Sequence, residues 1–166
     1  MTTYSRCSRL LLICGVALLG VTCKDSSPTG PSTTTPTTTT PTLPPNTGSV
    51  KVDVNPNPVP FSGQPVTDAG PGCNNVKNTW FYDQVLTETG GSEVTFTNRT
   101  DLFDGFTVNE LSGLKIVVPA NGTLTLHTRW CSGTPQDHTA RSSFTGTDAT
   151  GKLVTVTGPN VRLMKP

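Results

Sequence analysis

The chain is short of charge. Of its 166 residues, 14% are Asp, Glu, Lys or Arg, and 12 basic residues against 11 acidic ones leave a formal net charge of +1. Soluble domains average roughly 25% charged residues, so the composition argues against an all-helical protein rich in Glu and Lys. Near-neutrality argues against nucleic acid as a partner, since nucleic-acid-binding proteins carry a basic patch. The length suits one domain of ordinary size.

The short motifs of common catalytic sites are also missing. The sequence holds no GxSxG, HExxH, Walker or GxGxxG motif. Its two histidines, His127 and His138, are fewer nitrogen ligands than a copper or catalytic zinc site usually takes, and both are predicted to be exposed. Asp83 and Glu88 are candidates for the acid and base of glycoside hydrolysis, but nothing in the sequence places them across a cleft. The prediction is a protein without catalytic activity, metal or cofactor.

Long apolar runs are rare, and the one of note lies near the N-terminus. Arg6 and Arg9 precede an apolar run of about 12 residues, 10–21, whereas a membrane-spanning helix needs roughly 20. Residues 1–22 are therefore predicted to be an export signal. The run ends at Gly20-Val-Thr-Cys23, which resembles the lipobox of bacterial lipoproteins. The resemblance implies a diacylglyceryl group on Cys23 and a membrane partner; the alternative is an ordinary secretory signal with an incidental cysteine.

The segment after Cys23 cannot build a hydrophobic core. Residues 24–47 are almost wholly Thr, Pro and Ser. Such a stretch stays disordered and extended, at about 3.1 Å per residue, and reaches on the order of 70 Å. Residues 23–47 are therefore predicted to be a lipidated tether in the cell envelope. Lys24 does not match the acidic retention rule of inner-membrane lipoproteins, which favours the outer membrane.

Residues 48–166 show the alternation of apolar and polar residues that is typical of strands. Val50 and Val52 alternate with polar neighbours, and the same pattern recurs up to residues 161–163. Seven or eight short strands, broken by Gly, Pro, Asn and Asp, predict an all-β protein with one antiparallel β-sandwich. Asn121-Gly122 between two alternating runs predicts a hairpin with a type I′ turn. The Pro-rich residues 55–60 predict a crossover at a sheet edge.

Cysteine use fits an exported domain. Cys73 and Cys131 are the two cysteines outside the N-terminal segment, and an even pair in an exported chain favours one disulfide over two free thiols. The order Cys73, Trp80, Cys131 resembles the Cys, Trp, Cys signature of immunoglobulin domains, and the strand count resembles immunoglobulin-like or fibronectin-III-like modules. We expect a sandwich with its disulfide at one end, where both cysteines adjoin turns.

Two groups of residues are candidates for binding. In residues 79–86, alternation places Trp80 and Tyr82 on one strand face and Phe81 on the other. Rings on an exposed face would stack on a glycan; the alternative is a strand covered on both faces. Asp101 and Asp104 are candidate calcium ligands, although a plain turn is the better interpretation.

Three functions are open at this point. The first is a tethered module at the cell surface that binds an envelope protein or a glycan. The second is a structural spacer or scaffold lipoprotein without a specific ligand, and the third is a small metal-assisted enzyme.

Overall fold

The computed structural model describes residues 49–66, 73–74 and 76–166. The predicted export signal, Cys23 and the tether over residues 23–47 lie outside the described residues. No helix within the described part is long and apolar enough to cross a membrane.

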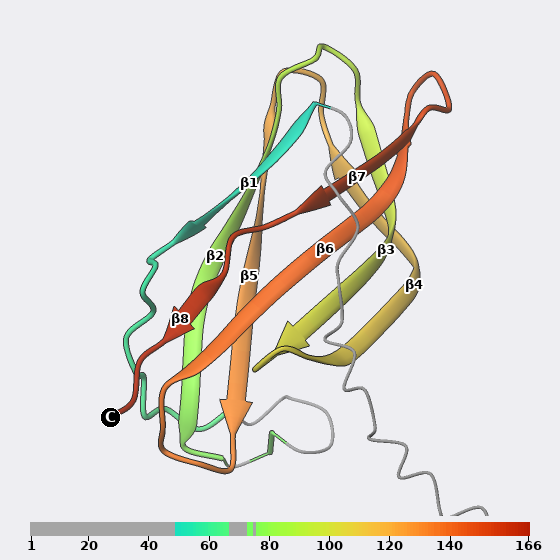
Figure 1. Cartoon of the computed structure of the whole chain (residues 1–166). Coiled ribbons are helices and arrows are strands. Elements are labelled where there is room, and N and C mark those ends of the chain that lie inside the picture. Colours follow the sequence, from blue (N-terminus) through green and yellow to red (C-terminus); the bar gives the residue numbers. More distant parts are fainter. Residues whose placement is uncertain (1–48, 67–72, 75) are drawn as a thin grey trace, which may run out of the picture. The chain divides into compact units, whose positions relative to one another are not determined.

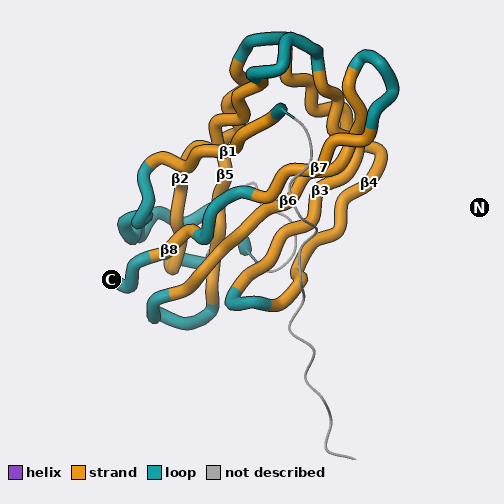
Figure 2. Tube along the Cα trace, turned by 45° about the horizontal axis from the view of Figure 1, so that its top comes forward, coloured by secondary structure: helices purple, strands orange, loops and turns teal. Residues whose placement is uncertain are grey.

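The described residues form eight strands, as predicted, and two antiparallel sheets packed against each other (Figures 1 and 2). The strands are β1 (Val50–Asn55), β2 (Asn78–Glu88), β3 (Val94–Phe103), β4 (Phe106–Val118), β5 (Thr123–Ser132), β6 (His138–Asp148), β7 (Leu153–Thr157) and β8 (Val161–Leu163). In this part of the chain, one sheet has the order β1-β2-β5 and the other the order β4-β3-β6-β7, with β8 also paired to β6. The all-β sandwich is confirmed.

Alternating side chains fill the space between the sheets. On β2, for example, Trp80, Tyr82 and Leu86 are buried, while Phe81 points outward. The buried apolar residues form two clusters. The first holds Val50, Val52, Leu86, Val94, Phe96, Val118, Phe144, Val154 and Val156. The second holds Val59, Trp80, Tyr82, Trp130, Ala140, Val161 and Leu163.

A layer of polar side chains separates the two clusters. Gln84 lies between Leu86 and Tyr82 on the inner face of β2, and Ser142 lies between Phe144 and Ala140 on β6. The Gln84 amide Nε2 donates to the hydroxyls of Thr128, at 2.9 Å, and Ser142, at 3.3 Å. Because a buried polar group without a partner is costly, this layer fixes how the two sheets align.

The Asn121-Gly122 turn does not form the predicted hairpin. β4 pairs with β3, and β5 pairs with β2, so the turn connects strands of different sheets. Asn121 has φ of 51°, whereas Gly122 is not among the residues with positive φ, so the type I′ prediction is also wrong. The backbone N–H of Asn121 donates to the Glu88 carboxylate at 2.8 Å, which ties the turn to the last residue of β2.

The predicted crossover at residues 55–60 is confirmed. After β1 the chain passes to the other sheet, where the Val59 N–H donates to the Arg162 carbonyl at 2.8 Å. Val59 forms a parallel bridge with Leu163 beside β8. On this side of the sandwich, the chain itself thus joins the edges of the two sheets.

Candidate functional site

Of the three aromatic candidates, one is on the surface. Trp80 is fully buried and its indole N–H donates to the Met164 carbonyl at 2.8 Å. Tyr82 is also buried, its hydroxyl accepting from the indole of Trp130 at 2.9 Å. Burial raises the pKa of the Tyr82 hydroxyl, although the Trp130 hydrogen bond opposes the rise. Phe81 is 43% exposed on the opposite face of β2, so it alone of these three is placed to stack on a ligand.

Asp101 belongs to the polar layer inside the sandwich. Its Oδ1 accepts from the Arg99 Nε at 2.8 Å and from the Ser142 hydroxyl at 2.6 Å. Its side chain is 4% exposed, and that of Arg99 is 16% exposed. Arg99 also lies over the Phe144 ring, 5.4 Å from its centroid. The Asp101 carboxylate is therefore engaged by a cation, and it does not meet Asp104 in a shared site.

Asp104 closes the turn between β3 and β4 and holds a histidine. With φ of 49°, it precedes Gly105, and its carboxylate accepts from His138 Nδ1 at 2.6 Å and from the Thr139 N–H at 2.8 Å. The prediction that His138 is exposed is wrong: it is 4% exposed, with its ring against Trp80 and Phe103. No group of three or more His, Cys, Asp or Glu side chains that would hold a metal occurs among the described residues.

The two carboxylates considered for glycoside hydrolysis lie on opposite faces of β2. Asp83 faces outward, where its Oδ1 lies 2.6 Å from Nδ1 of the exposed His127. Glu88 faces inward at the end of the strand and is 1% exposed. The structure therefore does not bring them together as an acid and base.

Glu88 instead organises the loop after β2. Its carboxylate accepts from the Ser49 hydroxyl and from the backbone N–H groups of Gly90 at 2.6 Å, Gly91 at 2.9 Å and Asn121 at 2.8 Å. These hydrogen bonds, that of Ser49 first, lower the pKa of the Glu88 carboxyl from 4.5 to about 2, against the opposing effect of burial. The charged form thus holds three segments of the chain together.

The lowered pKa predicts an acid-sensitive contribution to stability. Because the folded-state pKa lies below 4.5, the contribution is complete above pH 4.5 and is lost as the pH falls toward about 2. We expect Glu88→Gln to lower the melting temperature at pH 7. Between pH 4.5 and 2, the melting temperature of this variant should fall less steeply with pH than that of the wild type. Thermal denaturation across this range tests it, with the exposed Glu93→Gln as matched control. A Glu88→Gln profile parallel to that of the wild type would contradict the prediction.

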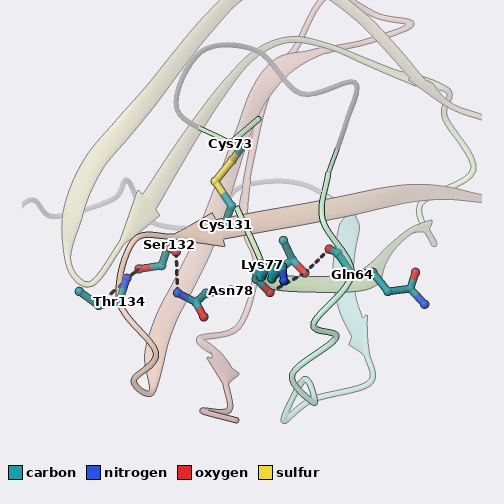
Figure 3. The surroundings of a disulfide bond; sticks show 8 residues. Gln64, Cys73, Lys77, Asn78, Cys131, Ser132 and Thr134 are labelled. Atoms are coloured by element: carbon teal, nitrogen blue, oxygen red, sulfur yellow. Dashed lines mark hydrogen bonds between the residues drawn. A yellow bond between two sulfur atoms is a disulfide. The ribbon is translucent and has the colours of Figure 1, made fainter. Parts of the chain in front are cut away.

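The predicted disulfide is present and lies at one end of the sandwich (Figure 3). Cys73, in a turn before β2, bonds to Cys131 near the end of β5, with Cα atoms 5.6 Å apart. Beside it, the Asn78 amide donates to the Ser132 carbonyl at 3.1 Å, and the Ser132 hydroxyl accepts from the Thr134 N–H at 3.1 Å (Figure 3). These hydrogen bonds fasten the end of β5 beside the disulfide.

Residues from the C-terminal half of β5 line two surface hollows. The outer hollow, of about 510 Å³, lies on the solvent face of the three-stranded sheet. Its lining residues are Phe81, Tyr82, Asp83, His127, Thr128 and Arg129. The edge hollow, of about 270 Å³, lies between β5 and the β3–β4 pair and contacts the disulfide. Its lining residues are Cys73, Arg99, Asp101, Phe103, Val108, Asn109, Arg129, Trp130 and Cys131.

Arg129 lines both hollows, so they meet at this residue on the strand edge. Sequence reasoning identified Phe81 and Asp101 as candidates but missed Arg129 and Val108. Arg129 gave a signal, since it has the same parity along its strand as His127, which was predicted to be exposed. Val108 gave none, because β4 residues 106–113 are all exposed and show no alternation of burial.

The fold defines an all-β sandwich of two antiparallel sheets. No protein-family model matches the chain, and no curated protein is significantly similar to it. One structural-genomics crystal structure matches with a TM-score of 0.53 at 14% identity, over 71% of this chain and 88% of the other. A second, from a Bordetella pertussis protein provisionally named ApaA, matches with a TM-score of 0.51 at 17% identity, over 74% and 98%. Likeness at this level of identity defines the fold alone.

Proposed function

We propose that the chain is a lipoprotein of the bacterial cell envelope, most simply of the outer membrane, whose β-sandwich binds an envelope protein or a glycan. Cys23 carries the lipid anchor, and residues 24–47 are the tether that sets the domain away from the membrane. The domain binds through its surface and catalyses no reaction.

One observation carries the binding role. The outer hollow combines the exposed ring of Phe81 with the Asp83–His127 pair and the side chain of Arg129 on the outer face of the three-stranded sheet. An exposed aromatic side chain beside a few polar groups is the composition that binding surfaces favour. Phe81 is directly across from Arg129 in the β2–β5 pairing, so the ring and the charge present one surface.

The anchor is tested by replacing the predicted lipid-attachment residue. We expect Cys23→Ala to abolish palmitate labelling of the chain and to move it from the membrane fraction to the fraction not associated with membranes, because the acyl chains provide the attachment. Metabolic labelling followed by fractionation measures both. The Cys14→Ala variant, in the middle of the apolar run, is the matched control and should label like the wild type. Unchanged labelling of Cys23→Ala would refute the anchor.

The binding role is tested by removing the exposed ring. With the full chain as bait on native envelopes, we expect Phe81→Ala to reduce the captured material by about tenfold, as truncation of a central aromatic contact does. Leu153→Ala is the matched control, since Leu153 is 61% exposed on the other sheet and should leave capture unchanged. Equal capture by wild type and both variants would exclude the outer hollow. Absence of any saturable capture by the wild type would leave the spacer role instead.

A further inference from the structure

The turn that connects the two sheets is held at both of its central residues. Residues 119–122 lead from the end of β4 in one sheet to the start of β5 in the other. Within the turn, the backbone N–H of Asn121 donates to the Glu88 carboxylate at 2.8 Å, and the Gly122 carbonyl accepts from the Glu88 backbone N–H at 2.9 Å. Because Glu88 is buried at the end of β2, these two hydrogen bonds fix the Asn121–Gly122 peptide to the three-stranded sheet.

The geometry of the turn accounts for the residue types Asn and Gly at its centre. Asn121 has φ of 51°, in the left-handed region, which Asn enters more readily than most residues other than Gly. A Cβ atom on Gly122 would lie 2.6 Å from Cγ of Pro119, which is too close unless the proline shifts. The fold thus favours an Asn-Gly pair at this place, and the sequence has no other.

The same pair is chemically labile. The backbone nitrogen of Gly122 can attack the side-chain carbonyl carbon of Asn121, because glycine has no side chain that obstructs the approach. The attacking nitrogen gives up its proton, the bond from Cγ to Nδ2 breaks, and ammonia leaves with that proton, so that a succinimide ring remains. Water then adds to either carbonyl of the ring and opens it to aspartate or to isoaspartate, with no change of oxidation state.

The side-chain amide of Asn121 is accessible for this reaction. Asn121 is exposed, and no described residue forms a hydrogen bond with its side-chain amide. The attacking nitrogen is restrained, since the Gly122 N–H donates to the Pro119 carbonyl at 3.0 Å. This hydrogen bond is lost when the turn opens. The hold of Glu88 on the turn therefore sets how fast the ring forms.

Asp104-Gly105 is a second pair that can form a succinimide, but its carboxylate is engaged. One oxygen of Asp104 accepts from His138 Nδ1 at 2.6 Å, and the other accepts from the Thr139 N–H at 2.8 Å. Both oxygens are thus held, and a carboxylate oxygen is a poorer leaving group than an amide nitrogen. Of the two pairs, Asn121-Gly122 is the one whose side chain is available to react.

Conversion would weaken the hold of Glu88 on the turn. In isoaspartate the main chain runs through the former side chain, so it is one methylene longer between the nitrogen of residue 121 and the carbonyl of Gly122. These are the two groups that Glu88 binds. Either product also adds a carboxylate to the turn. The Asn121 side chain lies beside Gly91, whose N–H donates to the Glu88 carboxylate at 2.9 Å, and a second negative charge so close disfavours the charged form of Glu88.

The turn lies at the end of β5 that the disulfide does not fasten. β5 begins at Thr123, next to the turn, and ends at Ser132, next to Cys131. The Cys73–Cys131 bond holds the second end covalently, whereas the first end depends on the hydrogen bonds to Glu88. Loss of these hydrogen bonds would loosen the connection between β4 and β5 and leave the disulfide end unchanged.

We propose that Asn121 is a site of spontaneous deamidation, and that its conversion to isoaspartate frees the turn from Glu88 and loosens this end of the sandwich as the protein ages. The modification needs water alone as co-reactant and no enzyme. It is independent of the lipid anchor and of the binding surface around Phe81.

The site is tested by incubating the purified full chain in mildly alkaline buffer. Peptide mapping by mass spectrometry detects the gain in mass from amide to carboxylate, and fragmentation distinguishes isoaspartate from aspartate. We expect Asn121 to convert before any other asparagine. Asn121→Gly is the matched control, because it removes the reacting amide and suits a φ of 51°. A folded chain in which Asn121 stays intact, while the same chain in urea converts there, would overturn the proposal.

The part of Glu88 is tested by loosening its hold on the turn. Glu88→Gln should speed the conversion by about tenfold, because hydrogen bonds to a charged acceptor are lost. Ser49→Ala, which removes the hydroxyl that donates to Glu88, should change the rate in the same direction, and the exposed Glu93→Gln should not change it. Rates in Glu88→Gln and Ser49→Ala equal to that of the wild type would contradict the role of Glu88.

The structural consequence is tested by hydrogen exchange before and after incubation. We expect the backbone amides of Gly90 and Gly91, which donate to Glu88, to exchange about tenfold faster in the isoaspartate fraction. Incubated Asn121→Gly should show no such change. Asn121→Asp adds the charge without the longer main chain and should show a smaller increase. Conversion without faster exchange at these amides would refute the loosening.

Discussion

Replacing both Cys73 and Cys131 with serine is expected to lower the free energy of unfolding by roughly 4 kcal/mol. The bond spans a sequence separation of 58 residues, and closing a loop of that length removes chain entropy from the unfolded state. For a domain of this size, the loss corresponds to a melting temperature lower by roughly 10 to 20 °C. Urea unfolding and thermal denaturation measure the two quantities.

Chemical reduction is the control for the cysteine variant. Dithiothreitol should lower the melting temperature of the wild type to that of the double serine variant and leave the variant itself unchanged. A wild type whose melting temperature is insensitive to reduction would show that the bond does not form in the protein, and the serine substitutions would then have little effect.

The Asp101→Ala variant is expected to cost about 3 to 5 kcal/mol, because it removes the carboxylate that compensates the largely buried guanidinium of Arg99. The Ser142 hydroxyl would lose its acceptor at the same time. Urea unfolding measures the difference. The matched control is Asp53→Ala at the exposed Lys51–Asp53 pair, whose side chains are 69% and 55% exposed, and where the expected cost is at most about 1 kcal/mol.

A double replacement separates the charge pair from packing. Arg99→Met with Asp101→Leu removes both charges and should recover most of the stability lost in Asp101→Ala, since well-packed apolar side chains replace buried ion pairs at little cost. If Asp101→Ala were no more destabilising than Asp53→Ala, the polar layer would have no part in holding the sheets together.

The strands were predictable because apolar residues alternate with polar ones wherever one face of a strand packs in the core and the other faces water. Trp80, Tyr82 and Leu86 on β2, and Val50 and Val52 on β1, face the core as their spacing indicates. The first half of β4 was not predictable. It lies at an open edge with both faces in contact with water, so Phe106 and Val108 are exposed, and no period-two pattern forms.

The pairing of the strands was harder to predict from the sequence than the strands themselves. Asn121-Gly122 has the residue types of a hairpin turn. The backbone N–H of Asn121 nevertheless donates to the carboxylate of Glu88, 33 residues earlier, and β5 pairs with β2 instead of β4. The choice of partner strand depends on contacts remote in sequence, which a turn motif does not encode.

The candidate site was predictable in part. Alternation correctly put Phe81 on the strand face opposite Trp80 and Tyr82, although the preferred interpretation had both faces covered, and His127 was correctly predicted to be exposed. His138 has the same parity as Ala140 and Phe144, two buried apolar residues of β6, so its burial follows from an alternation that its polarity obscured. Arg99 donates to Asp101, two residues farther along the same strand. This ion pair was not predictable, because it matters only when both side chains are buried, and the sequence does not show their burial.

The order of strands in the three-stranded sheet also has a mechanical meaning. β1 is the first strand of the chain, and it pairs with β2 at every position from Val50 to Asn55, while β2 pairs with β5. If a partner pulled on β5 while the N-terminal side were held, the force would run from β1 through β2 to β5 within one sheet. The hydrogen bonds between these strands would share that load along their length, and the backbone hydrogen bonds of the five-stranded sheet would lie outside its path.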